Sequence, residues 1–263
     1  MDLYRLHRGD APLIVSMPHV GTHVPATIAD TMTPIARHVV DTDWHVERLY
    51  DMAAGLGATT IAATHARYVV DLNRAPDNRP LYAGADNTEL VPLTTFAREP
   101  IYLPGQEPGL AEVARRVEAY WKPYHACLAA EIARLRERHE RVVLWEGHSI
   151  RSHVPRFFEG RLTDFNLGTG SGSSCDAGLA ARIEATAAAD NAFTSVLNGR
   201  FKGGFITRHF GQPDRGVHAI QLELSQITYM EEDLPFRYLA DTAAPTKALI
   251  ARLLEVALDW ARG

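Results

Sequence analysis

The sequence predicts an α/β protein, built as a doubly wound and mostly parallel sheet. Short apolar runs of strand length alternate along the chain with segments of helical spacing. Polar residues able to carry chemistry follow directly after several of these runs, as expected at the carboxyl edge of an open parallel sheet. No internal repeat, low-complexity tract or linker interrupts the pattern, so residues 1–263 are expected to form one domain.

Composition restricts the possible partners. The chain is 46% hydrophobic and 22% charged with a net charge of −5, and this mild acidity predicts binding neither to nucleic acid nor to a membrane surface. No apolar run approaches the roughly 20 residues of a membrane span, and no signal peptide is recognisable. Two cysteines, Cys127 and Cys175, do not make a disulfide framework. We therefore expect a cytoplasmic protein whose partner is a small molecule.

The first predicted strand is the apolar run from Leu13 to Met17. Pro18 cannot donate a hydrogen bond to a sheet ladder, so the strand should end there and leave His19 just past its end. The next elements expected in order are a helix opened by 41–45 and closed after Leu56 by Gly57, β-prone runs over 59–63 and 66–72, and a long loop over 75–109.

The second half of the chain continues the alternation. Apolar residues recur at helical spacing from Leu110 to Leu135, which predicts one long amphipathic helix bent near Pro123. The elements expected after it are a buried strand over 141–146 that delivers His148, a helix over 176–189, a loop over 198–216, a strand over 217–224 and a helix that starts at Pro245.

Three residues are candidates for holding a metal ion: His19, Asp43 and His148. Each follows a strand or opens a helix, so all three could meet at one rim of the sheet. Two imidazoles and a carboxylate that leave a fourth position open are a catalytic zinc arrangement. The alternative is that the histidines are hydrogen-bonded core or turn residues and that Asp43 is a carboxylate stabilised by a helix N-terminus.

Arginines near the end of the second β-prone run are candidates for anion binding. Arg67 and Arg74 flank Asp71 and Asn73, which should face one side of that strand. The rigid fork of a guanidinium suits bidentate capture of a carboxylate. A surface ion pair with Asp71 is the alternative.

Glu223 lies between leucines near the end of the predicted strand over 217–224. A carboxylate rarely occupies such a position without a partner, so Glu223 either pairs with an arginine or acts as a general base with a shifted pKa. Lys202 and Arg208, on either side of Gly203 and Gly204, could close on an anionic substrate or could be solvated loop charges.

Taken together, these motifs resemble the N-formylglutamate deformylase family, also called N-formylglutamate amidohydrolases. The resemblance extends over nearly the whole chain and rests on the blocks Ser16–Gly21, Asp41–His45, Arg67–Arg74, Leu81–Tyr82, Trp121–His125, His148–His153, Asp164–Gly168, Asn198–Gly204 and Gln221–Leu224. The stretch from Asp71 to Arg74 and the late strand glutamate are also similar to zinc carboxypeptidases and aspartoacylase. One departure is Glu146, where these deformylases usually carry aspartate.

The resemblance implies a phosphorylase/hydrolase-like fold and hydrolysis of N-formyl-L-glutamate to formate and L-glutamate. It implies Zn²⁺, or another divalent metal, on the three candidate ligands, and it assigns the carboxylate ligand to Asp43 rather than Asp41, which is well placed as a helix N-cap. Glu223 would be the general base and Arg67 would face the oxyanion. The residues implied for the two substrate carboxylates are Asn73 and Arg74 for one and Lys202 or Arg208 for the other.

Two other readings stay open from the sequence. A related zinc acylase or carboxypeptidase could act on another N-acyl amino acid. Alternatively, the chain could be a non-catalytic binding protein for acidic amino acids that keeps the arginines without the metal. Glu223 discriminates between enzyme and binding protein, because a binding protein gains nothing from a buried, unpaired base.

Overall fold

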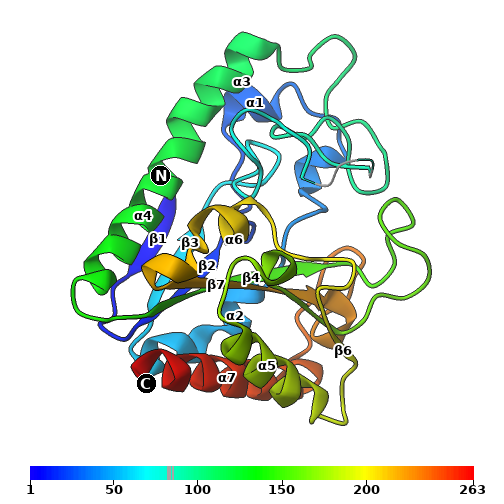
Figure 1. Ribbon diagram of the computed structural model, residues 1–263. Helices are drawn as coiled ribbons and strands as arrows, with labels where there is room; N and C mark the ends of the chain where they lie inside the picture. The colour runs from blue at the N-terminus through cyan, green and yellow to red at the C-terminus, as the bar shows by residue number, and fades with distance from the viewer. Residues whose placement is uncertain (82–83, 85) are drawn as a thin grey trace.

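The computed structural model describes residues 1–81, 84 and 86–263, and its centre is a sheet of seven strands in the order β1-β3-β2-β4-β7-β5-β6 (Figure 1). The bounds are β1 Tyr4–His7, β2 Leu13–Met17, β3 Thr59–Ala63, β4 Val142–Ile150, β5 Phe165–Gly168, β6 Ser195–Leu197 and β7 Val217–Ser225. β3, β2, β4 and β7 run parallel to one another. β1 pairs antiparallel with β3, and β5 pairs antiparallel with β7 but parallel with β6. The predicted α/β class is confirmed, with a sheet that is mixed at both edges.

Helices cover both faces of this sheet. The longer ones are α3 Leu110–Arg116, α4 Lys122–Arg136, α5 Ala177–Ala188, α6 Phe205–Phe210 and α7 Ala240–Arg262, with the shorter α1 Ala26–Ala29 and α2 Val46–Leu49. In Figure 1, α2, α5 and α7 lie below the sheet and α3, α4 and α6 lie above it. Successive residues of one strand enter opposite cores, since Leu13 packs in the core on the α7 side and Ile14 in the core on the α4 side.

The central strands are buried along their whole length, because both faces are covered. Short 3₁₀ segments complete the connections, at Ala36–His38, Asp51–Leu56, Gly170–Gly172, Pro213–Arg215 and Gln226–Thr228. Among the described residues, 75–109 contains turns and isolated bridges but neither a helix nor a strand, as the loop prediction requires. In the part of the chain that the structure describes, every helix is too short or too polar to cross a membrane.

The predicted strand over 66–72 is wrong. These residues form turns packed beside β3, because their backbone groups bond to other parts of the chain instead of to a ladder. The amide of Asp71, for example, donates to the carbonyl of Leu90 at 2.7 Å. β-branched and aromatic residues at 68–70 produced a strand pattern, yet tertiary contacts decide the backbone conformation here.

The helix expected from 41 to 56 is broken in two. α2 has only four residues, Val46–Leu49, and a 3₁₀ segment follows over Asp51–Leu56. His45 precedes α2 with a φ of 62°, so regular helix cannot start earlier. The expected left-handed closure at Gly57 is confirmed by its φ of 75°.

Three boundaries differ from the predictions in the second half. β4 continues to Ile150, because it pairs with β7 over nine residues, so His148 lies within the strand and not after it. The expected loop over 198–216 contains α6. The last helix begins at Ala240, so Pro245 lies inside it rather than at its start.

Candidate metal and substrate site

Three ligand side chains meet at the carboxyl ends of the central strands. His19 lies just after β2, Asp43 lies in the turn before α2, and His148 lies in β4. Their ligand atoms all lie within 4.8 Å of one another, and each residue is buried. The backbone brings two of them together directly, because the amide of Asp43 donates to the carbonyl of His19 at 3.0 Å.

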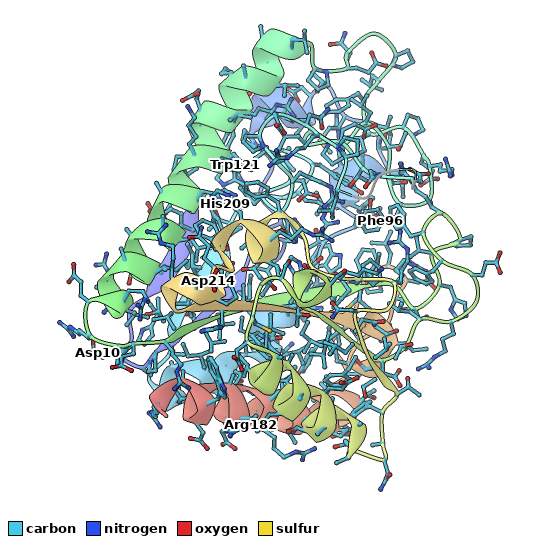
Figure 2. All side chains as sticks on the ribbon, viewed as in Figure 1. Asp10, Phe96, Trp121, Arg182, His209 and Asp214 are labelled. Atoms are coloured by element: carbon cyan, nitrogen blue, oxygen red, sulfur yellow. The ribbon has the colours of Figure 1, made fainter. Side chains whose placement is uncertain are left out.

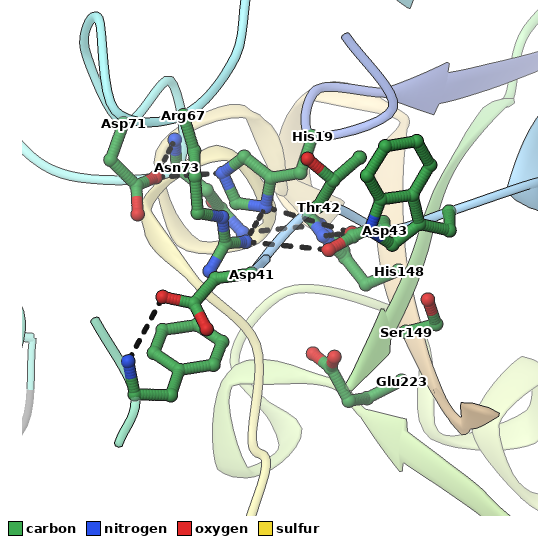
Figure 3. Close-up of polar contacts among 12 residues, drawn as sticks. His19, Asp41, Thr42, Asp43, Arg67, Asp71, Asn73, His148, Ser149 and Glu223 are labelled. Atoms are coloured by element: carbon green, nitrogen blue, oxygen red, sulfur yellow. Dashed lines mark hydrogen bonds and ion pairs between the residues drawn. The ribbon is translucent and has the colours of Figure 1, made fainter. Parts of the chain in front are cut away.

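The Nδ1 atoms of both imidazoles face Asp43 (Figure 3). Asp43 Oδ2 lies 3.0 Å from Nδ1 of His148 and 3.7 Å from Nδ1 of His19. On its other side, Nε2 of His19 donates to Oδ1 of Asp71 at 2.7 Å, which leaves Nδ1 with its lone pair. Glu146 Oε2 lies 3.4 Å from Nε2 of His148. A carboxylate behind each imidazole is the usual support of a metal-binding histidine.

The charges of this site favour a cation. Buried carboxyl groups come from Asp41, Asp43, Asp71, Glu146 and Glu223, whereas the cation that lies against the ligands is the buried guanidinium of Arg67. Asp43 Oδ1 is buried and has no hydrogen-bond partner among the described residues. An oxygen left without a donor beside two imidazoles suits a metal ion, so the residues present fit one.

Hydrogen bonds shift the ligand pKa values against the effect of burial. Burial alone would raise the pKa of Asp43, but the hydrogen bond with His148 and the charges of Arg67 and His19 lower it. Burial likewise acts to lower the pKa of His148, yet hydrogen bonds with Asp43 and Glu146 raise it to about 10. The carboxylates therefore attract positive charge to this position.

Glu223 lies on β7 directly opposite His148 of β4 in the parallel register. Its carboxyl group accepts a hydrogen bond from the side-chain amide of Gln221 at 3.2 Å, and only 9% of the residue is exposed. Burial, reinforced by the negative charge of Asp43, raises the pKa of Glu223 to about 7. A carboxyl group that titrates near neutrality can both accept and release a proton.

Arg67 lies between the ligands and the cavity. Its Nη2 contacts Nδ1 of His19 and lies 3.5 Å from Asp43 Oδ1. The aromatic ring of Phe96 covers its guanidinium, with 5.0 Å from Cζ to the ring centre. Arg67 thus places a positive charge, held in position by these contacts, next to the metal-ligand candidates on the wall of the cavity.

Asn73 and Arg74 also reach the cavity. The Asn73 amide group lies 3.2 Å from Nε2 of His148, and its oxygen accepts from the backbone of Ile206 at 2.9 Å. Arg74 donates to the side chain of Thr88 at 2.8 Å. It also lies 3.9 Å from Asp71, so the ion pair considered from the sequence is present, although Arg74 still lines the cavity.

One cavity opens beside the ligands. Its wall among the described residues consists of His19, Arg67, Asn73, Arg74, Leu81, Asp86, Asn87, Thr88, Phe96, His148, Ser149, Ile150, Phe157, Arg200, Phe201, Gly204, Gln221 and Glu223. His19, His148, Glu223 and three arginines therefore line the same cavity.

Neither Lys202 nor Arg208 belongs to this wall as described. Arg208 lies on α6, donates to the carbonyl of Gly203 at 2.9 Å, and lines a neighbouring hollow. Arg200 of the same loop reaches the cavity instead, with its Nε bonded to the carbonyl of Phe157. Arg200 was not predicted from the sequence, although the block Asn198–Gly204 contains it, because residue types do not determine the path of a glycine-rich loop.

Asp41 does not cap a helix. Its carboxyl group accepts hydrogen bonds from the hydroxyl of Tyr68 at 2.6 Å and from the backbone amide of Phe96 at 2.9 Å. α2 begins only at Val46 and has no side-chain cap. Asp41 therefore contacts the segment over 66–74 through Tyr68 and the long loop over 75–109 through Phe96, a role that depends on contacts distant in sequence.

The fold and the site together define a class of protein. A buried His/Asp/His set at the carboxyl ends of parallel strands, beside a carboxyl group that titrates near neutrality, is typical of metal-dependent hydrolases. The family model of the N-formylglutamate amidohydrolases matches residues 11–230. The chain belongs to this family.

Named proteins and a solved structure agree with this assignment. The chain is 53% identical to the N-formylglutamate deformylase of Pseudomonas aeruginosa, over 97% of this chain and 96% of that protein. It is 49% identical to that of Pseudomonas putida, over 97% and 95%. The crystal structure of the N-formylglutamate amidohydrolase from Ralstonia eutropha JMP134 superposes with a TM-score of 0.84 at 25% identity, over 100% of this chain and 99% of that one.

Proposed function

We propose that this chain hydrolyses N-formyl-L-glutamate to formate and L-glutamate in a reaction that depends on a divalent metal. The observation that carries the proposal is the buried set of His19, Asp43 and His148 next to Glu223, beside a cavity lined by three arginines. The names of the relatives, which share about half of their residues with this chain, support the substrate.

His19, Asp43 and His148 would hold the metal, and Zn²⁺ suits two imidazoles and one carboxylate. Bound there, a divalent cation supplies Lewis acidity, which polarises a carbonyl group and makes water more acidic. Asp71 and Glu146 would keep the two imidazoles oriented for this purpose.

Glu223 would move the protons. Ionised, it accepts a proton from the water that attacks the formyl carbon; as the carbon–nitrogen bond breaks, it returns that proton to the leaving amine. Its pKa of about 7 suits both steps, because neither protonation state is strongly preferred at neutral pH. Arg67 would stabilise the negative charge that develops on the formyl oxygen, since its guanidinium is already held in place by Asp43 and Phe96.

The arginines would select a dicarboxylate. Arg74, held by Thr88, would bind one carboxylate of the substrate, with the amide group of Asn73 nearby. For the other carboxylate we propose Arg200 as the binding residue, rather than Lys202 or Arg208, because Arg200 lines the cavity. Its guanidinium lies 5.3 Å from the ring centre of Phe201, which limits the orientations it can take. We further propose a single domain over 1–263 and a cytoplasmic location.

The test combines metal content with product formation. The purified protein should contain close to one equivalent of a divalent metal and should release formate from N-formyl-L-glutamate. N-acetyl-L-glutamate and N-formyl-L-glutamine, offered at equal concentration, report the limits on the acyl group and on the second carboxylate. Formate release that persists after exhaustive chelation, with the absence of metal verified by elemental analysis, would contradict the metal-dependent mechanism.

A further inference from the structure

A single helical rod packs along the loop that supplies the site. α3 and α4 are joined without interruption by a π-helical segment, Val117–Trp121, so the rod extends from Leu110 to Arg136. The loop, residues 66–74, carries Arg67, Asn73 and Arg74 to the cavity wall and Asp71 to the imidazole of His19. Having no strand partner, it needs other donors for its carbonyl groups.

Three side chains of the rod donate to these carbonyls. Nη1 of Arg116 lies 3.4 Å from the carbonyl of Tyr68 and 3.3 Å from that of Val69. Nε2 of His125 donates to Leu72 at 2.9 Å, and Nε1 of Trp121 donates to Arg74 at 3.0 Å. The three donor residues are all less than a tenth exposed.

The side chains and the carbonyls of the loop point to different partners. Asp71 and Asn73 turn their side chains towards His19 and His148, as the contacts of 2.7 and 3.2 Å show. The carbonyl of Leu72, between them, turns to the rod. A shift of the backbone at Leu72 would therefore move both supports of the imidazoles together.

The π segment explains how the rod reaches the whole loop. In an α-helix with about 3.6 residues per turn, Arg116 and Trp121 are five positions apart and would not share a face. A π-helical turn is wider and closes i→i+5 hydrogen bonds, which brings residues five apart into line. Pro123 favours this local register, because it has no N–H for an ordinary α-helical bond.

Packing fixes the two aromatic donors. Trp121 and His125 stack with their ring centres 3.6 Å apart and an angle of 18°, and the ring of Phe205 at the start of α6 lies 5.5 Å from each. Figure 2 shows Trp121 on the rod, on the side where α6 lies. The rings cannot turn away without opening this cluster, so their N–H groups remain aimed at the loop.

We propose that Trp121 and His125 are positioning residues of the site. His125, through Leu72, sets the orientation of Asp71 and Asn73 and hence the affinity for metal. Trp121, through Arg74, sets the position of the substrate-binding guanidinium. This inference rests on the proposed function for its metal and substrate readouts, while its effect on the loop can be measured without either.

The test removes the N–H donor of His125 or of Trp121 by substitution with phenylalanine, which retains an aromatic ring. His125→Phe should raise the Kd for Zn²⁺, measured by chelator competition, by about 10-fold, the lower end for residues that support metal ligands. His125→Gln places an amide N–H within reach of Leu72 and should restore most of the affinity. Trp121→Phe should raise KM for N-formyl-L-glutamate several-fold more than it lowers kcat.

Hydrogen exchange of the metal-free protein supplies the independent readout. The amides of Asp71, Asn73 and Arg74 are all hydrogen-bonded and should exchange faster in Trp121→Phe and His125→Phe. Trp260→Phe, on α7 and far from the loop, is the matched control and should leave exchange, Kd and KM unchanged.

The outcomes distinguish failure of this inference from failure of the proposed function. If both ring-retaining variants melt lower but exchange, Kd and KM stay at wild-type values, the two residues are structural and the inference is wrong. If the wild-type protein binds no metal and releases no formate, the proposed function fails, and the exchange data alone decide whether the rod holds the loop.

Discussion

Two carboxyl groups of the site have pKa values shifted in opposite directions, although both are buried. Asp43 lies against two imidazoles and the guanidinium of Arg67, which lower its pKa. Glu223 accepts a hydrogen bond from the neutral side-chain amide of Gln221, and its negative charge is repelled by that of Asp43. Burial therefore dominates and raises the pKa of Glu223 to about 7. Such divergence separates an always ionised metal ligand from a group that can exchange protons.

The role of Glu223 as a base leads to a rate prediction. Glu223→Gln keeps the shape of the side chain and removes the basic oxygen, so kcat should fall by about 10²–10⁴-fold while metal content stays unchanged. Steady-state kinetics and elemental analysis of the same preparation test this. A kcat within a few-fold of wild type would mean that another group accepts the proton.

The same residue predicts a pH dependence. Because the ionised form is the base, kcat/KM should rise with pH up to about 7, and a bound cation would move this limb to lower pH by favouring the carboxylate. The folded-state pKa lies above the ordinary glutamate value of 4.5, so the neutral carboxyl group stabilises the metal-free fold below pH 4.5, and this stability is lost as the pH rises towards 7. Metal-free Glu223→Gln should therefore gain melting temperature over wild type only as pH increases through this window. Equal melting temperatures throughout would contradict the raised pKa.

Arg200 predicts the selectivity for a second carboxylate. Arg200→Gln should raise KM for N-formyl-L-glutamate by about 10-fold or more, because a charge-assisted pair contributes roughly 1.5–3 kcal/mol. KM for N-formyl-L-glutamine should change much less. Arg208→Gln is the matched control, since Arg208 lines a different hollow. If Arg208→Gln shows the larger effect, the second carboxylate binds elsewhere.

At the scale of elements, the start of α6 and the loop over 66–74 interlock. The backbone amide of Phe205 donates to the carbonyl of Asn73 at 3.2 Å, and that of Ile206 donates to its side-chain oxygen. Gly204 permits this approach, because a Cβ built there would lie 2.2 Å from Nδ2 of Asn73. A glycine at this position thus allows α6 to hold a residue that contacts His148.

Gly204→Ala should therefore weaken both the fold and the site. The added methyl group must displace Asn73 or the start of α6, and overpacking of this kind costs typically about 1–3 kcal/mol. We expect a lower melting temperature together with weaker metal binding. Gly55→Ala, where a Cβ would meet nothing within 4 Å, is the control and should leave both unchanged. Unaltered metal affinity in Gly204→Ala would show that Asn73 does not support the site.

At the scale of the whole molecule, the site joins segments distant in sequence. His19 follows β2, Asp43 precedes α2 and His148 lies in β4. Glu223 comes from β7, so the central parallel strands position most of the reactive side chains. The long loops between them close over this edge. A metal ion bound among these segments would link them and would stabilise the folded state relative to the unfolded chain.

Metal binding should consequently raise the stability of the protein in a concentration-dependent way. One site occupied at 100 times its Kd adds about 2.7 kcal/mol to the free energy of unfolding. The melting temperature should rise with added Zn²⁺ and fall on chelation, whereas Asp43→Ala should show no such dependence. A melting temperature indifferent to Zn²⁺ in the wild-type protein would contradict a site formed by the folded chain.

Much of this protein could be predicted from local patterns. Apolar runs identify β2 and the first half of β4, and β-prone or largely apolar runs identify β3 and β7, because strands covered on both faces are rich in apolar residues. The strand ends then indicate where ligands gather, so His19 and His148 and the nearby Asp43 could be singled out before their distances were known. Glu223 was recognisable because a carboxyl group inside a leucine-rich strand is costly unless it has a function.

Only the tertiary structure decided how the connecting segments run. Residues 66–72 have the composition of a strand, but the carbonyl groups of Tyr68 and Leu72 accept from Arg116 and His125, which lie on a helix some fifty residues away. Asp41 likewise bonds to Tyr68 and Phe96 rather than to a helix that follows it. Arg200 reaches the cavity where Lys202 and Arg208 do not. Local patterns report which residues are buried, whereas the partners of loop backbones and of charged side chains depend on contacts between distant segments, and these exist only once the chain has folded.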